Sequence, residues 1–393
     1  MKTNRTFDMV IYGASGYSGR LVAEYLWNRY GKHQCFKLAI AGRDLEKLQG
    51  VKAALNGGGD LGILIADAED LGSLTTMANS TRVIITTVGP YQFYGTKLVE
   101  ACASVGTDYL DLCAEPHWAR RMIDTYTGAA QSSGARILFS CGFDSIPSEI
   151  GVYSVQEAAK QKTRGYASSV KCLVRELKGG YSGGTAESLK ASLNAAAKDT
   201  CVAKLLADPF ALTPGFAGPA QPETNAVMFD DDLGVWTAPS LMAPINTRSV
   251  HRLNYLLDQR YGENFLYDEC MMTGPGDEGK SAAEAIATAP SPLGGDHAPK
   301  PGTGPTKEER DTGSFNLLFI ARTDKAGLLK VGLYGDRDPG YGSTSKMISE
   351  TAIALLTQKI ECPGGIWTPG AALREELKVR LTAKAGILVW IED

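Results

Sequence analysis

The chain has 393 residues, of which 44% are hydrophobic and 21% charged, and its formal net charge is −4. A chain of this length exceeds what one ordinary hydrophobic core holds, so we expect two domains. The composition excludes a disordered or fibrous protein, and the slightly acidic charge without basic runs excludes a nucleic-acid-binding protein.

The chain carries no targeting or metal-binding pattern that we can identify. Its first residues, MKTNRTFDMVIY, contain no apolar signal segment, and no stretch reaches the length of a membrane span. The eight cysteines are scattered without the spacing of a zinc site. We therefore expect a cytoplasmic protein with reduced thiols, no bound metal and at most peripheral membrane contact.

Residues 7 to about 145 alternate between short, almost continuously apolar runs and amphipathic stretches. Such runs are typical of parallel strands that are buried on both faces. The predicted strands are residues 7–13, 36–42, 62–67, 82–89, 108–112 and 135–142. The predicted helices between them are residues 20–30, 45–55, 68–78, 97–105 and 117–133. This alternation predicts a Rossmann domain with a doubly wound parallel sheet over residues 1–148, of fold class α/β.

The pattern changes after Pro147. A strand near 169–183, a long alanine-rich helix over 185–208 and a strand pair at 313–323 and 327–335 predict an inserted α+β domain, residues 149–339, with a mostly antiparallel sheet. Within it, we expect a flexible Pro/Gly segment near 274–312. Residues 340–393 contain two amphipathic stretches and are predicted to return and complete the first domain. From the antiparallel sheet of the second domain we also expect a homodimer.

Three glycines follow the first predicted strand in GASGYSG and open a helix. Gly13 suits a tight turn, Gly16 lets backbone approach a diphosphate, and Gly19 lets helix and strand pack closely. The free N–H groups at the helix start attract phosphate. The sequence therefore predicts a dinucleotide site that also includes the residues between these glycines, namely Ala14, Ser15, Tyr17 and Ser18.

The end of the second strand carries Arg43 where an NAD enzyme usually places an acidic residue. A guanidinium fits a 2′-phosphate, with Lys47 one turn later, whereas Asp44 is expected to cap the following helix. We therefore predict NADPH as the cofactor and include Asp67, after the third strand, in its site. The alternative is that Arg43 is only a solvated residue at a helix start.

Two further loops follow strands at the carboxyl edge of the sheet, where ligands bind in such folds. The first is predicted to contact the nicotinamide ribose, and the second combines a thiol, a carboxylate and hydroxyls. The predicted contacts are Val88, Gly89 and Pro90 in the first loop and Cys141, Gly142, Phe143 and Asp144 in the second. The candidate catalytic residues are Tyr91, Tyr341 and Asp144. Packing is the alternative for each tyrosine, and capping of the next helix is the alternative for Asp144 and Ser145.

Together, the motifs GASGYSG, AGR, VGPYQFYG, GTDYLDLCAE, CGFDSIPS, SGGT and DPGYGSTSKM resemble the saccharopine dehydrogenase-like oxidoreductases. The branch that the chain resembles most is that of the trans-acting enoyl reductases of bacterial lipid and polyketide assembly. The resemblance spans nearly the whole chain, including GGIWTPGAAL, except residues 289–306. It implies hydride transfer from NADPH in a cleft between two domains. An enoyl thioester or another carrier-bound acyl group is the implied substrate, and a polyketide synthase or acyl carrier protein is the implied partner.

Three alternatives remain open at this point. One is a saccharopine reductase-like imine reductase, although Arg248 and Arg252 are the only candidates for an arginine cluster in the second domain. Another is a semialdehyde or acyl-phosphate reductase that uses Cys141, although its surroundings lack the motif of those enzymes. The third is an NADP-binding, lipid-associated adaptor without turnover, which the apolar stretch Leu233–Asn246 would suit.

Overall fold

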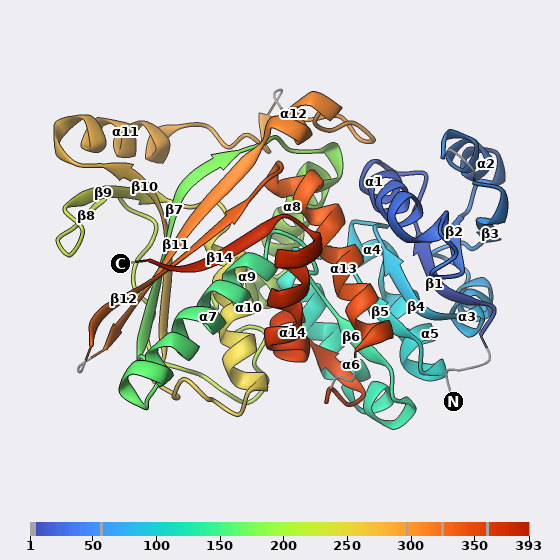
Figure 1. The fold of residues 1–393 in the computed structure, drawn as a ribbon, viewed down its shortest axis with the longest axis horizontal. Helices are drawn as coiled ribbons and strands as arrows, with labels where there is room; N and C mark the ends of the chain where they lie inside the picture. The colour runs from blue at the N-terminus through green and yellow to red at the C-terminus, as the bar shows by residue number, and fades with distance from the viewer. Residues whose placement is uncertain (1–4, 56–57, 296–297, 324–325, 359–360, 393) are drawn as a thin grey trace.

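The computed structural model describes residues 5–55, 58–295, 298–323, 326–358 and 361–392. In this part of the chain, two seven-stranded sheets lie side by side, with helices packed between them and on the outer face of the first sheet (Figure 1). The predicted α/β fold, with a parallel Rossmann-like sheet and a second, mostly antiparallel sheet, is confirmed.

The first sheet is parallel throughout and has the strand order β13-β6-β5-β4-β1-β2-β3. Most residues of its central strands are buried, as their apolar runs predict. The strands are β1 (Phe7–Tyr12), β2 (Leu38–Gly42), β3 (Gly62–Ile65), β4 (Thr81–Thr86), β5 (Asp108–Leu110), β6 (Arg136–Leu138) and β13 (Gly365–Trp367).

Helices cover both faces of this sheet, and their side chains form two separate cores. The helices that precede the second sheet in the chain are α1 (Tyr17–Leu26), α2 (Leu45–Ala54), α3 (Leu71–Ser80), α4 (Tyr91–Tyr94), α5 (Thr96–Val105), α6 (Pro116–Ser133) and α7 (Ile146–Thr163). Helix α13 (Thr344–Thr357) returns from the end of the chain to pack on α1 and β4. Short π-helical turns, η1 (Trp27–Gly31) and η4 (Pro339–Ser343), extend α1 and precede α13.

The second sheet has the order β14-β12-β11-β7-β10-β9-β8, and every pairing except β7 with β10 is antiparallel. Its strands are β7 (Ser169–Lys178), β8 (Met228–Asp230), β9 (Val235–Pro239), β10 (Leu266–Gly274), β11 (Ser314–Thr323), β12 (Gly327–Gly335) and β14 (Ile387–Glu392). The remaining helices are α8 (Gly183–Lys198), α9 (Thr200–Ala207), α10 (Ala243–Leu256), α11 (Gly276–Thr288), α12 (Lys307–Thr312) and α14 (Pro369–Lys384). Helix α7 packs on β11 and β12 and joins the two halves through α10 and α14.

Three boundaries differ from the sequence prediction. The segment 274–312, which was predicted to be flexible, contains two helices. Helix α11 is rich in alanine, and α12 begins with a capping box formed by Thr306 and Glu309. The helix predicted over 185–208 is divided at Asp199, whose side chain caps α9. Residues 340–393 complete the first sheet only in part, since β13 pairs with β6 but β14 pairs with β12 in the second sheet.

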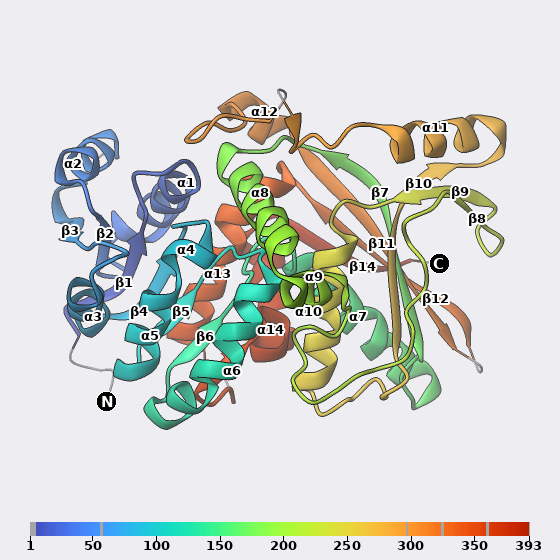
Figure 2. The same ribbon diagram turned by 180° about the vertical axis from the view of Figure 1, so that it is seen from behind.

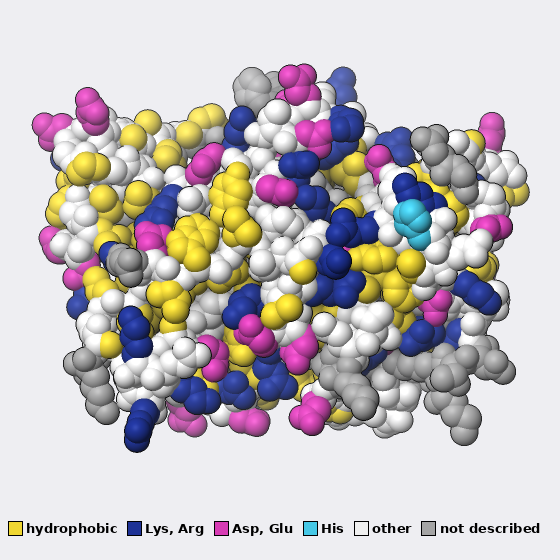
Figure 3. Space-filling model, in the orientation of Figure 1, with side chains coloured by type: hydrophobic (Ala, Val, Ile, Leu, Met, Phe, Trp, Pro, Cys, Tyr) yellow, Lys and Arg dark blue, Asp and Glu magenta, His cyan; other side chains and the backbone are white. Residues whose placement is uncertain are grey.

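The surface shows where apolar and charged side chains gather. Strand β14 forms one edge of the second sheet and exposes Leu388 and Trp390. Basic side chains run down the middle of the face in Figure 3, from α12 over α13.

Among the described residues, no helix is both long and apolar enough to cross a bilayer. The expected homodimer stays a prediction.

Candidate functional site

The glycine turn between β1 and α1 has the geometry that its sequence predicts. Gly13 has φ +86°, and its N–H donates to the Ala41 carbonyl over 2.9 Å. A Cβ on Gly19 would lie 2.2 Å from the Gly13 carbonyl oxygen, and a Cβ on Gly13 would lie 2.7 Å from Val88 Cγ2. These two contacts require glycine, because a methyl group has no space in either place.

The start of α1 is open to an anion. Gly16 occupies its N-cap position in extended backbone, and no side chain caps the helix. No acidic residue stands in its first turn either, so the first N–H groups and the positive end of the helix dipole are free to bind phosphate. Ala14 is buried in the turn, whereas Ser15 and Ser18 are half-buried at its surface. The turn therefore fits a dinucleotide diphosphate.

The end of β2 presents the predicted basic group. Arg43 is exposed and makes no ion pair within the described residues. Asp44 caps α2 by accepting from the Lys47 N–H over 3.1 Å, as predicted, and these backbone and side-chain contacts lower its pKa. The Lys47 ammonium lies 3.3 Å from the Asp44 carboxylate. Asp67 accepts from the Glu69 N–H and so forms the turn after β3. Arg43 is thus the group best placed for a 2′-phosphate.

The β4 loop carries Val88, Gly89 and Pro90 between the glycine turn and the second half of the molecule. The Val88 side chain packs against the backbone of Gly13, where a Cβ would lie 2.7 Å from its Cγ2. A Cβ on Gly89 would lie 3.6 Å from Ser188 Oγ of α8. Helix α8 therefore covers this loop from the second half (Figure 2). A ligand that extends from the glycine turn along the sheet edge reaches the start of α8.

Tyr91 does not point its hydroxyl into this cleft, in contrast to the sequence prediction. It is buried, and its hydroxyl donates to the Thr86 carbonyl over 3.3 Å and accepts from the Leu112 N–H over 3.1 Å. Burial raises the pKa of Tyr91 well above its usual value. Its backbone N–H donates to the Glu115 carboxylate over 2.7 Å. These contacts hold the β4 loop in place and leave the phenol unsuited to donate a proton to a substrate.

The loop after β6 is built on buried contacts. Cys141 is completely buried, and burial raises the pKa of its thiol well above the usual value, with Asp111 and Glu149 as further causes. Without a neighbouring cation to stabilise a thiolate, this thiol is not an activated nucleophile, which argues against the acyl-phosphate reductase alternative. Gly142 packs against Thr344, whose hydroxyl accepts from the Phe143 N–H over 3.0 Å.

Asp144 is the carboxyl group of this loop that is available to interact with a ligand. It is half-buried and makes no hydrogen bond within the described residues. Neither it nor Ser145 caps α7, and the Ser145 hydroxyl instead lies 2.7 Å from Ser249 Oγ. Burial, with the nearby Glu269 charge as a second cause, raises the pKa of Asp144 to about 6. A carboxyl group with such a pKa can donate a proton near neutral pH.

Glu269 of β10 is a buried carboxylate that the sequence did not single out. It accepts hydrogen bonds from Ser240 (2.9 Å), Asn246 (2.8 Å), Tyr267 (3.0 Å) and Ser148 (3.4 Å). Burial raises its pKa, and these donors oppose the rise. A small cavity of about 10 Å³ lies beside it, lined also by Phe143 and Met242. Glu269 is thus a fixed acidic group behind Asp144.

Tyr341, in η4, connects the two halves. Its hydroxyl accepts from the Ser182 N–H over 2.5 Å and lies 2.8 Å from Thr185 Oγ1 at the start of α8. Its ring meets Tyr17 edge to face with centroids 5.1 Å apart. Burial raises the pKa of Tyr341, and Asp144 is a minor further cause. Because the backbone N–H already donates to this hydroxyl, its proton remains available to Thr185 or to a ligand.

The two arginines considered for an arginine cluster stabilise the fold through hydrogen bonds to backbone carbonyls. Arg248 donates to the carbonyls of Asp208, Pro244 and Leu206, and Arg252 donates to those of Leu212 and Ile366. Both guanidinium groups are buried and already satisfied, so neither is free to hold a dicarboxylate substrate.

The histidines offer no better acid. His251 is buried between aromatic rings, and burial lowers its pKa to about 3. Burial also lowers the pKa of His117, with Arg121 as a second cause. Both rings are therefore neutral at physiological pH.

A wider groove, with a volume of about 370 Å³, lies on the outer face of the second sheet between Lys171, Asp268 and Phe229. Its lining comes from strands β7 to β12, on the side of the molecule away from the glycine turn (Figure 1). We therefore place the candidate site at the meeting point of the glycine turn, the β4 and β6 loops, η4 and α8.

Comparisons with known proteins concern the family and the cofactor. A family model described as the saccharopine dehydrogenase NADP binding domain matches residues 9–138. One relative, from Mycobacterium tuberculosis, is named as a trans-acting enoyl reductase. It is 39% identical to this chain over 411 aligned residues, which cover 98% of this chain and 97% of that protein. The trans-acting enoyl reductase of Mycobacterium ulcerans is 33% identical over 414 aligned residues, with the same coverage.

Among solved structures, the apo form of saccharopine dehydrogenase (L-Glu forming) from Saccharomyces cerevisiae is similar to this chain with a TM-score of 0.53. The match covers 98% of this chain and 100% of that chain at 12% identity. At this identity, the similarity concerns the fold and not the substrate.

Proposed function

The chain belongs to the saccharopine dehydrogenase-like oxidoreductases, together with its trans-acting enoyl reductase relatives, and on this basis we propose a reaction for it. It is an NADP-dependent oxidoreductase with a Rossmann-like cofactor domain. We propose that it reduces the activated C=C bond of an enoyl thioester in lipid or polyketide synthesis.

The residues at the glycine turn fit NADPH. The uncapped start of α1 and the backbone around Gly13 and Gly16 would hold the diphosphate, and Arg43 would hold the 2′-phosphate. The β4 and β6 loops, through Gly89 and Gly142, would line the nicotinamide. When bound there, NADPH supplies a hydride from its nicotinamide ring.

The protein's own contribution to an enoyl reduction is a proton and a polar environment. Hydride addition at the β carbon leaves negative charge on the thioester oxygen and the α carbon, so one proton must be supplied to complete the reduction. Asp144 is the one predicted acid without a fixed hydrogen-bond partner among the described residues, and its pKa is raised to about 6. We assign Asp144 as the proton donor and Tyr341 as a hydroxyl that orients the substrate carbonyl.

The substrate is proposed to arrive on a carrier. The names of the relatives state that they act in trans, which favours a substrate that another protein presents. An acyl carrier protein or polyketide synthase is the proposed partner.

The test is NADPH oxidation by the full chain with three classes of acceptor: enoyl thioesters on pantetheine or an acyl carrier protein, cyclic imines, and acyl phosphates. We expect turnover with the enoyl thioesters, with one saturated product formed for each NADPH consumed. Turnover with imines alone would overturn the C=C assignment, and tight NADPH binding without turnover on any class would favour an adaptor. Asp144→Asn should abolish most of the activity while NADPH affinity stays unchanged.

A further inference from the structure

The Pro/Gly-rich residues 298–312, which we call the strap, lie across the space between α8 and α1 (Figures 1 and 2). At one end, the Thr303 carbonyl accepts from the Gly183 N–H over 3.1 Å, and a Cβ on Gly183 would lie 2.0 Å from the Lys300 oxygen. The next residue, Gly304, packs on the start of α1, because a Cβ there would lie 2.5 Å from the Tyr17 ring. The strap therefore packs against the starts of two helices that border the candidate site.

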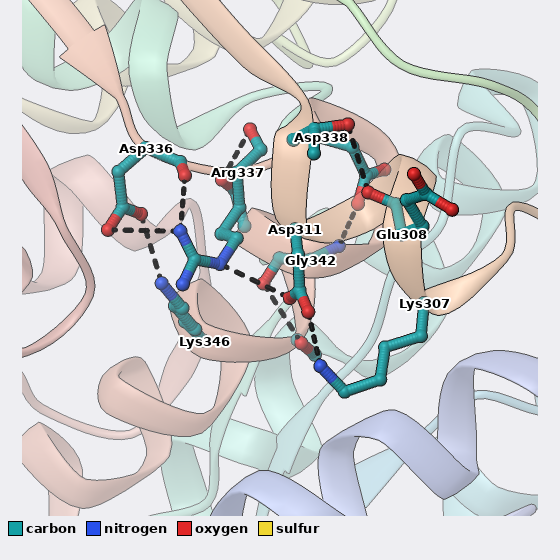
Figure 4. Close-up of polar contacts among 11 residues, drawn as sticks. Lys307, Glu308, Asp311, Asp336, Arg337, Asp338, Gly342 and Lys346 are labelled. Carbon is teal, nitrogen blue, oxygen red and sulfur yellow. Dashed lines mark hydrogen bonds and ion pairs between the residues drawn. The ribbon is translucent and has the colours of Figure 1, made fainter.

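Helix α12, at the end of the strap, is fixed to the loop that follows β12. Figure 4 shows Asp311 between Lys307 and Arg337, and the Asp311–Arg337 ion pair measures 3.5 Å. The Asp338 N–H donates to the Arg310 carbonyl over 3.1 Å. The Asp311–Arg337 ion pair and this hydrogen bond join α12 to the loop and fix the backbone that carries Arg310, whereas the Lys307–Asp311 pair lies within α12 itself.

The Arg310 guanidinium points toward the start of α1. Its Nη1 donates to the Tyr17 hydroxyl over 3.0 Å and to the Pro305 carbonyl over 2.6 Å, and its Cζ lies 5.8 Å from the centre of the Tyr17 ring. The Tyr17 hydroxyl in turn donates to the Pro305 carbonyl. Asp338 and Asp311 both interact electrostatically with this group, yet the Asp338 carboxylate accepts from the N–H groups of Tyr341 and Gly342, and Asp311 pairs with Lys307 and Arg337.

Within the described residues, Arg310 forms no ion pair with any carboxylate, although its neighbour Asp311 forms two. It is half-buried, so its charge is only partly solvated. A positive charge without an ion pair among the described residues, beside a helix start that also lacks an acidic cap, is an arrangement suited to a bound anion.

We propose that Arg310 binds the diphosphate of NADPH, with Tyr17 positioning the guanidinium, so that the strap closes the cofactor site from the second half of the molecule. The two halves would then share one cofactor: α1 supplies backbone N–H groups, and the strap supplies the cation. The inference rests on the NADPH assignment and is independent of which double bond is reduced.

The experiment is an equilibrium titration of the full chain with NADPH and, separately, NADH, followed by cofactor fluorescence without any substrate. Arg310→Ala removes a charge-assisted contact, so we expect the Kd for each cofactor to rise by about tenfold or more and by similar factors, because both carry the diphosphate. Arg310→Lys should restore part of the affinity. Tyr17→Phe, which removes only the positioning hydroxyl, should give a smaller loss.

Lys307→Ala is the matched control, since it removes a cation from the same helix whose partner is Asp311 and not Tyr17. Its NADPH affinity should stay within about twofold of the unaltered chain, as is usual for an exposed ion pair. The proposal is overturned if Arg310→Ala binds NADPH as tightly as the unaltered chain, or if Lys307→Ala weakens binding equally. If Arg310→Ala fails to fold, Arg310→Lys and Tyr17→Phe decide, and unchanged affinity in both refutes the proposal. Absence of turnover on enoyl thioesters would refute the proposed reaction and leave these binding results standing.

Discussion

The pair Glu269 and Asp144 gives the sharpest prediction about the chemistry. Glu269 accepts four hydrogen bonds from neutral donors and has no cation partner among the described residues. An ionised Glu269 opposes ionisation of Asp144, and it is the second cause, after burial, of the rise of the Asp144 pKa from 3.8 to about 6. The other titratable groups that face Asp144 are Tyr181 and Tyr341, which are neutral at this pH.

The substitution Glu269→Gln removes the charge and keeps the shape of the side chain. An interaction of about 1.4 kcal/mol between two partly buried charges corresponds to about one pKa unit. The pKa of Asp144 should therefore fall to about 5, since burial, its larger cause, remains. If protonated Asp144 is the acid, the protonated fraction at pH 7 falls from about one tenth to about one hundredth, and kcat falls about tenfold.

The assay is the pH dependence of kcat for NADPH oxidation between about pH 5 and pH 8, with the acceptor that gives turnover. We expect the unaltered chain to lose activity above about pH 6, and the variant to lose it about one unit lower, with similar plateaus in acid. Glu284→Gln, on the exposed helix α11, removes a carboxylate far from Asp144 and should leave the profile unchanged. An unshifted or upward-shifted profile in Glu269→Gln would refute this role of Glu269.

Three further predictions concern the cofactor and stability. Arg43→Ala should raise the Kd of NADPH about tenfold or more and leave that of NADH unchanged in a fluorescence titration, whereas equal losses would mean that no 2′-phosphate contact exists. Gly19→Ala should lower the thermal midpoint and abolish NADPH binding, because its Cβ would lie 2.2 Å from the Gly13 oxygen; a fully stable, binding-competent variant would contradict the turn geometry. Burial raises the pKa of Glu149 from 4.5 to about 8, so the folded state holds a proton that the unfolded state has lost between these values. Its contribution to the free energy of unfolding should therefore decrease by up to about 1.4 kcal/mol per pH unit as the pH rises, and urea titrations of Glu149→Gln should show a correspondingly weaker pH dependence.

The sequence predicted the first sheet well because its central strands are mostly buried on both faces and are therefore rich in apolar residues. The glycine turn was predictable for a related reason, since Gly13 and Gly19 occupy positions without space for a Cβ. The second sheet was predicted in part, through strand β7 and the local hairpin of β11 and β12. The parallel pairing of β7 with β10 joins residues nearly a hundred positions apart and leaves no local pattern.

Within the site, sequence reasoning identified the loops but not the direction of every side chain. Tyr91 follows a strand end, as a ligand-facing residue would, yet backbone groups of Thr86 and Leu112 take up its hydroxyl. Glu269 and Arg310 gave no signal, because each acts through contacts with segments far away in the chain. A buried acid in a strand and an arginine in a short polar helix are common in sequences, and only their tertiary neighbours distinguish these two.

The most direct measurement is a crystal structure of the chain with bound NADPH. Our account predicts the diphosphate within hydrogen-bond distance of the first N–H groups of α1 and the 2′-phosphate beside Arg43. It also places the reactive face of the nicotinamide toward Asp144. A nicotinamide ring turned away from Asp144, or a diphosphate bound anywhere other than at Gly13 to Gly19, would contradict it.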